Sequence, residues 1–201
     1  MAKIVFTQQE INEIIRVYYA GHNEWNKIRL GTIKSKIKTE KSTRQNDFCC
    51  YCRRDIRNEF RLVLDIEHVL PKSKIIKHMF TSKNISVSCK RCNMNIKGDD
   101  VSFLSMPIDE LPKRVFRSKY YKIIHPNLDK YNNHLVRIAF QVGDEIFVKY
   151  FVKNRSEKGM FTREYFRLTE FERNSSNRAQ GGSGDEVNNP YLLELLNSIV
   201  P

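Results

Sequence analysis

The middle of this 201-residue chain lacks acidic side chains, because no Asp or Glu lies between His68 and Gly98. That stretch holds seven Lys or Arg residues, and the whole chain has 35 basic against 23 acidic residues, a formal net charge of +12. Such a charge says little about a fold, but it favours a polyanionic partner, nucleic acid before an anionic membrane. We therefore expect DNA as a partner, with RNA not excluded.

The sequence also lacks internal repeats and any long apolar run. No stretch could form a membrane-spanning helix, and the first residues include polar and acidic side chains where a signal peptide needs an apolar core. We expect no membrane contact and a cytoplasmic location, where five cysteines are more often metal ligands or free thiols than disulfides. An apolar fraction of 40% is enough for a packed core.

Helical patterns dominate the beginning of the chain. Thr7 and Glu10 form a T-x-x-E capping box, and apolar residues then repeat at helical spacing, which predicts a helix over 8–20. Gly21 ends this helix, and a second amphipathic helix is expected over about 24–38.

The segment 27–44 carries seven basic residues and one acid, Glu40. A solvated helix face would explain this charge. A surface that follows phosphates explains it better, because a second basic stretch lies downstream.

An alternating apolar pattern predicts a strand over 61–69, which Pro71 ends because proline cannot donate to a sheet. A short strand over 85–88 and a short helix over 91–97 are expected next, the helix closed by Gly98.

The last third of the sequence predicts more strands. Residues 134–153 favour a β-hairpin that turns at Gly143–Asp144, and a third strand is expected over 160–168 after a loop. A glycine-rich linker and a short apolar helix follow. The fold class is α+β, in four parts: an N-terminal basic helical segment, a core, an α+β extension with the hairpin, and the linker with its helix (residues 1–45, 46–100, 101–180 and 181–201).

Two Cys-x-x-Cys pairs, Cys49 with Cys52 and Cys89 with Cys92, have the spacing of a tetrahedral zinc site. We expect a structural Zn²⁺, with redox or incidental cysteines as the alternative. Cys50 is expected to be a spare, buried thiol. The zinc would tie the 36 intervening residues into one loop, and four thiolates would leave it no open position for catalysis.

Polar residues inside and just after that loop suggest chemistry. Glu67 directly precedes His68, and Asn93 follows the second cysteine pair. Carboxylate and amide oxygens suit Mg²⁺ or Mn²⁺, and a neutral imidazole suits deprotonation of a water. A lone histidine at a strand end is more often structural. Adjacent side chains on a strand also point to opposite faces, so Glu67 and His68 should diverge unless the strand bends.

These residues resemble an HNH endonuclease with a zinc-bound ββα-metal (treble-clef) core. The likeness covers residues 49–98 and consists of the run EHVLP from Glu67, Asn84, and a C-x-x-C-N-x-x-x-K motif that ends at Lys97. It implies a zinc-stapled ββα-metal core with an N-terminal helical pair and a C-terminal β-hairpin and helix extension.

The resemblance also implies roles for single residues. His68 would be the general base, Asn84 would brace the loop that orients His68, and Glu67 with Asn93 would bind the catalytic Mg²⁺ or Mn²⁺. Glu67 stands where the family often has Asp, and Asn93 replaces the last histidine of the motif name. Lys97 stands where some members have a further histidine ligand, and a protonated lysine cannot bind a cation.

We therefore expect Lys97 to contact phosphate together with other basic residues of the stretch. Contacts to phosphate carry no base information, so weak sequence preference is expected. The expected phosphate contacts are Lys72, Lys74, Lys77, Lys90, Arg91 and Lys97.

A weaker likeness concerns the H-P-x-x-D-x-Y-x-x-H element from His125 to His134. It is similar to stand-alone HNH subunits of prokaryotic antiphage systems of the Septu type, which pair the nuclease with an ABC-like ATPase. His125, Asp129 and His134 would then support the active site, although structural turn residues are the more ordinary interpretation. Two other functions stay open: a non-catalytic zinc module that binds nucleic acid, and an interaction subunit whose basic face docks an acidic protein.

Overall fold

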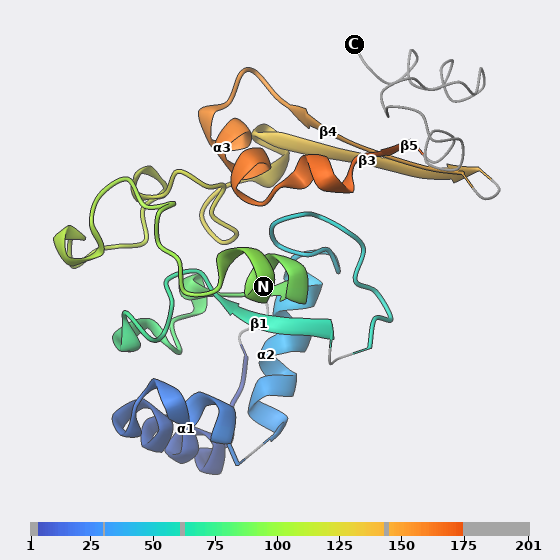
Figure 1. Ribbon diagram of the computed structural model, residues 1–201. Coiled ribbons are helices and arrows are strands. Elements are labelled where there is room, and N and C mark those ends of the chain that lie inside the picture. The colour runs from blue at the N-terminus through green and yellow to red at the C-terminus, as the bar shows by residue number, and fades with distance from the viewer. Residues whose placement is uncertain (1–3, 30, 61–62, 143–144, 175–201) are drawn as a thin grey trace.

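The computed structural model describes residues 4–29, 31–60, 63–142 and 145–174. The fold is α+β, with helices and two small antiparallel sheets (Figure 1). The expected linker and terminal helix over 181–201, and the hairpin turn at Gly143–Asp144, lie outside the described residues. Among the described residues, no helix has the length and apolar character needed to cross a membrane.

Helix α1 (Gln8–Ala20) begins at the predicted capping box. The Thr7 hydroxyl accepts a hydrogen bond from the Glu10 backbone N–H at 3.2 Å, and the Glu10 carboxylate accepts one from the Thr7 N–H at 2.8 Å. These two bonds satisfy donors that a helix start leaves unpaired, and the predicted first helix is confirmed.

The second helix differs from the expectation over 24–38. A 3₁₀ turn (His22–Lys27) comes first, and helix α2 (Gly31–Arg44) follows after a break. The Glu13 carboxylate accepts a hydrogen bond from the Arg29 backbone N–H at 2.9 Å, which satisfies that donor outside any helix. The break therefore depends on a contact from α1, which local sequence patterns do not reveal.

Strands β1 (Leu64–His68) and β2 (Ile85–Cys89) pair antiparallel, and each first residue lies opposite the last residue of the other strand. One wide helical turn (Arg91–Lys97) follows, and Gly98 closes it with φ +51°. Both expected strands and the short helix are confirmed in type, although β1 begins later than predicted.

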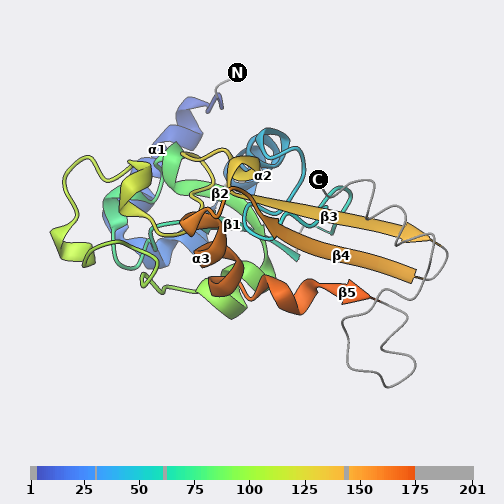
Figure 2. The same ribbon diagram turned by 90° about the horizontal axis from the view of Figure 1, so that it is seen from above.

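The second sheet has the order β3–β4–β5, with β3 (Leu135–Val142), β4 (Glu145–Val152) and β5 (Arg173–Asn174). The first two strands pair along their whole length, which confirms the predicted hairpin. Figure 2 shows this sheet extending to one side of the β1–β2 pair.

The prediction of a strand over 160–168 is wrong, because helix α3 (Glu157–Tyr165) covers most of this segment. Ser156 caps this helix, and its hydroxyl accepts a hydrogen bond from the Gly159 N–H at 3.1 Å. A Cβ at Gly159 would collide with the His134 carbonyl oxygen, so only glycine lets α3 approach the start of β3 this closely.

The β1–β2 pair lies between two hydrophobic clusters. Ile66 and Ile85 pack with Trp25 and Val17 in a cluster supplied by the N-terminal helices. Glu67, the next residue of β1, accepts a hydrogen bond from Tyr51 of the larger cluster, which contains the cysteine pairs and residues of the C-terminal extension. In Figure 1, β1 accordingly lies between the α1–α2 segment and the second sheet. Side chains of β1 therefore enter protein on both faces of the strand, which fixes their positions.

Candidate functional site

The four paired cysteines lie together and are buried. Their sulfur atoms all lie within 4.8 Å of one another, and the Cys89 sulfur is 3.8 Å from that of Cys49 and 3.9 Å from that of Cys52. A tetrahedral zinc with Zn–S bonds of about 2.3 Å separates its sulfurs by about 3.8 Å. The arrangement therefore fits a structural metal such as zinc.

Cys50 lies outside this cluster although it is buried beside it. Burial raises the pKa of its thiol well above the ordinary value, so the thiol stays protonated. Its backbone N–H donates to the Val87 carbonyl at 3.1 Å, which fastens the first cysteine turn to β2.

Glu67 is fully buried, and its side chain lies on the face of β1 that meets the larger cluster. Its Oε1 accepts a hydrogen bond from the Tyr51 hydroxyl at 2.8 Å and forms an ion pair with the Lys97 ammonium at 2.9 Å. Its Oε2 has no hydrogen-bond partner among the described residues. A buried carboxylate oxygen without a partner is a place where an ion or a water is expected.

Lys97 lies inside the protein, with a side chain that is 1% exposed. Its ammonium donates to the backbone carbonyls of His68 at 3.0 Å and Gly98 at 3.3 Å, in addition to the Glu67 ion pair. This placement corrects the expectation that Lys97 contacts phosphate, because the buried carboxylate holds the ammonium away from the surface.

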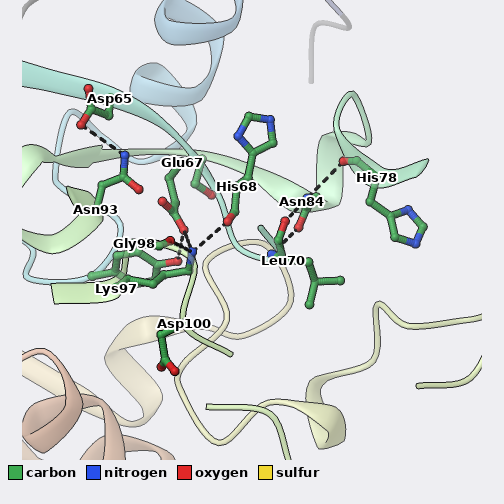
Figure 3. A network of polar contacts seen from close by, with 12 residues as sticks. Asp65, Glu67, His68, Leu70, His78, Asn84, Asn93, Lys97, Gly98 and Asp100 are labelled. Carbon is green, nitrogen blue, oxygen red and sulfur yellow. Dashed lines mark hydrogen bonds and ion pairs between the residues drawn. The ribbon is translucent and has the colours of Figure 1, made fainter. Parts of the chain in front are cut away.

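The His68 imidazole lies on the other face of β1, as the alternation of side chains requires (Figure 3). Its ring contacts the Trp25 ring edge-on, with centroids 4.6 Å apart. Burial, and then the positive charge of Lys72, lower the pKa of His68 to about 3. The imidazole is therefore neutral at physiological pH.

A hydrogen bond also fixes the tautomer of His68. Its Nε2 lies 2.9 Å from the Met79 carbonyl oxygen, and since a carbonyl can only accept, Nε2 carries the proton. Nδ1 is then the nitrogen with the free lone pair. His68 lines an open hollow of about 320 Å³. The structure thus presents a neutral imidazole with a defined acceptor nitrogen, on a residue that lines this hollow.

Asn84 connects the segment after His68 to the start of β2. Its Oδ1 accepts from the Leu70 N–H at 2.7 Å, and its Nδ2 donates to the carbonyls of Leu70 at 3.0 Å and His78 at 3.1 Å. All three partners are backbone groups of the loop that carries Met79, the acceptor for His68 (Figure 3). The geometry agrees with a bracing position, whereas a catalytic role stays a prediction.

Asn93 lies between β1 and the hollow beside His68. Its Nδ2 donates to the Asp65 carboxylate at 3.2 Å, which orients the amide, and in Figure 3 the amide oxygen is turned toward Glu67. Glu67 and Asn93 thus offer hard oxygen ligands that suit Mg²⁺ or Mn²⁺. The adjacent Lys97 ammonium would weaken binding of a divalent cation there by like-charge repulsion.

The other expected phosphate contacts divide into two groups. Lys72 and Lys90 line hollows beside β1, and Lys74 and Lys77 are exposed on the loop after it. Arg91 instead turns toward the C-terminal extension, where it donates to the Phe166 carbonyl at 3.1 Å and pairs with Glu170 at 2.7 Å. Arg91 therefore joins two parts of the fold, and the structure does not support it as a phosphate contact.

The residues of the H-P-x-x-D-x-Y-x-x-H element hold turns of the chain together. Asp129 accepts from the His125 N–H at 2.8 Å and pairs with Lys158 at 2.7 Å. His134 lies 2.7 Å from the Ser156 hydroxyl at the start of α3. These contacts favour the structural interpretation.

The sequence prediction favoured a phosphate-following surface over residues 27–44, but it named no individual residue of that segment at the site. A second hollow of about 390 Å³ adjoins the first, and its lining includes Asp65 and residues of the N-terminal segment. Lys34 and Lys38 of α2 are among them, and their i, i+4 spacing was a signal that both face one side of the helix. No sequence pattern indicated that Met94 and Trp25 lie at this hollow.

No protein-family model matches this chain, and a search among curated proteins gives no match either. The interpretation of the site therefore depends on its own geometry.

Proposed function

We propose that this protein is a metal-dependent HNH-type endonuclease that hydrolyses phosphodiester bonds, with DNA as the favoured substrate. The observation that carries the proposal is the state of His68. Its ring is neutral, its Nε2–H is bound to the Met79 carbonyl, and it opens on a hollow that also contains Lys72 and Asn93.

In this mechanism His68 is the general base. Its Nδ1 accepts a proton from a water, the water oxygen forms a bond to phosphorus, and one P–O ester bond breaks. A pKa of about 3 keeps the base unprotonated but makes it weak. A bound phosphate beside Lys72 would raise the pKa of His68, because its negative charge favours the imidazolium form.

Glu67 and Asn93 would hold the Mg²⁺ or Mn²⁺. The support is the unpartnered Oε2 of Glu67 and the orientation of the Asn93 amide. When bound, the cation supplies charge stabilisation to the phosphate oxygens and the leaving alkoxide. Glu67 and His68 act from opposite faces of β1, so the two groups would approach the scissile phosphate from different sides.

A zinc-stapled ββα-metal core would give this site its frame. The order of elements supports it, because a cysteine turn, two antiparallel strands, a second cysteine pair and a helical turn follow one another. Zinc on the four thiolates would fix the helical turn that carries Asn93 against the strands that carry His68. The antiphage role and the ABC-like ATPase partner rest on the sequence resemblance and stay predictions.

The proposal is tested with zinc-loaded protein on supercoiled plasmid in Mg²⁺, in Mn²⁺ and in EDTA. We expect conversion to open-circular or linear DNA with either cation and none in EDTA. Fluorescence anisotropy with labelled DNA at several salt concentrations separates the rivals. Salt-sensitive binding without cleavage would favour a binding module, and absence of binding would favour an interaction subunit.

A further inference from the structure

The two hollows beside β1 adjoin each other, and we call the two together the groove. Four residues line both of them: Ile66, Lys72, Asn93 and Met94. One wall comes from α2 through Lys34 and Lys38, and the other from Lys72 and Lys90. Helix α2 thus supplies two of the lysines that line the groove, and His68 lines the adjoining hollow.

The charges of this groove are incompletely neutralised. Neither Lys34 nor Lys72 forms an ion pair among the described residues, whereas Lys90 lies 3.4 Å from the Asp65 carboxylate. The pKa of Lys34 is lowered by burial and then by the positive charges of Lys38 and Lys72. An anion in the groove would relieve this repulsion, so the groove fits a polyanion that contacts both walls.

An apolar side chain stands between the lysines. Met94 is 65% exposed, although it follows Asn93 directly and lines both hollows. Its sulfur lies 3.5 Å from the Lys90 ammonium. An exposed thioether flanked by cations matches proteins that insert an apolar wedge between base steps from the minor groove.

The groove offers no aromatic face for an unpaired base. Trp25, its one aromatic lining residue in the described chain, is 6% exposed. The Trp25 ring already contacts His68, Phe80 and the Lys34 ammonium. Sites for single strands usually stack bases on aromatic side chains, so the groove favours a duplex.

We propose that this groove binds double-stranded DNA across its minor groove, with Lys34 of α2 and Lys72 on the phosphates and Met94 as a wedge that opens a base step. The inference deepens the proposed nuclease function and rests on it. It gives the N-terminal segment a direct role in holding the substrate.

Binding is measured by fluorescence anisotropy with the full zinc-loaded chain, without Mg²⁺ or Mn²⁺. The probes are a fluorescein-labelled DNA duplex and one of its single strands. We expect the duplex to bind more tightly, and Lys34→Gln and Lys72→Gln each to lower the slope of log K against log salt by about 0.9. Lys113→Gln is the matched control, because Lys113 is exposed and lines neither hollow.

The wedge is tested with duplexes that carry 2-aminopurine at successive positions. Wild-type protein should raise the fluorescence of the probe at one step, where the base loses its neighbours. Met94→Ala should still bind the duplex and should lose that rise. An equal rise of fluorescence with Met94→Ala, or no rise with either protein, would contradict the proposal that Met94 opens a base step.

Different experimental outcomes would contradict the groove proposal and the proposed nuclease function. Wild-type cleavage together with a Lys34→Gln variant that binds like Lys113→Gln would overturn the α2 contact and leave the nuclease standing. Tighter binding of the single strand would overturn the duplex assignment in the same way. Duplex binding that depends on Lys34, without cleavage in either cation, would overturn the nuclease and keep the groove.

Discussion

The Lys97 ammonium lies 2.9 Å from the Glu67 carboxylate, with side chains that are 1% and 0% exposed. A carboxylate beside a strand end and a lysine from the following helical turn thus neutralise each other inside the protein. The same lysine donates to the carbonyl of His68, so the pair also fixes the backbone that carries the proposed base.

Removing the cation should destabilise the fold. Lys97→Met leaves Glu67 buried without its counter-charge, which costs about 3–5 kcal/mol. Urea unfolding of zinc-loaded protein measures the loss, and Glu67→Gln/Lys97→Met should recover much of it because neither charge remains. A single variant within about 1 kcal/mol of wild type would show that the pair is not formed in solution.

The amount of zinc bound per chain should depend on the four clustered cysteines and not on Cys50. Cys52→Ser should lose bound zinc and unfold at lower temperature, because three thiolates hold the metal less well than four. Cys50→Ser should keep one zinc per chain, since Cys50 lies outside the cluster. Elemental analysis of purified variants gives the answer, and equal zinc loss in both variants would contradict the assignment.

Asn84→Ala should loosen the loop that carries Met79. Three backbone groups lose their partner in a buried place, and we expect a loss of about 3 kcal/mol, since each unsatisfied group costs about 1–3 kcal/mol. Asn95→Ala is the control, because Asn95 is exposed and should change stability by less than about 0.5 kcal/mol. Equal stability of the two variants in urea would contradict the bracing position.

Acid should destabilise the protein through its buried histidines. Burial lowers the pKa of His125 to about 3, while Asp129 and Lys158 act on it in opposite directions. Below about pH 6.5 the unfolded state therefore binds a proton on His125 that the folded state does not bind. The free energy of unfolding consequently decreases as the pH falls from there toward 3.

His125→Gln should make this dependence shallower. Near pH 5 the slope of the unfolding free energy should drop by about 1.4 kcal/mol per pH unit, which is the contribution of one proton. Urea titrations at several pH values measure the slope. An unchanged slope would mean that His125 takes up its proton in the folded protein as well.

Local patterns predicted much of the fold. The capping box at Thr7, the alternation in β1 and the two cysteine pairs each act within a few residues, and the structure has all of them. Residues 160–168 were misassigned because aromatic and β-branched residues favour strands, whereas the Ser156 cap and the contact of Gly159 with β3 select a helix.

The site was harder to predict, because its contacts join distant parts of the chain. The motif placed His68, Asn84 and Asn93 near one another. It gave no sign that Lys97 turns inward to Glu67, since the charge of a lysine does not show which side of a helical turn it faces. The α2 wall of the groove depends on how the N-terminal helices pack on β1, which the spacing of residues does not determine.

The rate of DNA cleavage by His68→Ala tests the central claim most directly. The variant should keep its zinc and its affinity for duplex DNA, because His68 holds neither. Its single-turnover rate in Mg²⁺ or Mn²⁺ should fall at least about 100-fold below wild type, the usual contribution of a general base. Cleavage at the wild-type rate would contradict the account, because His68 would then not activate the water.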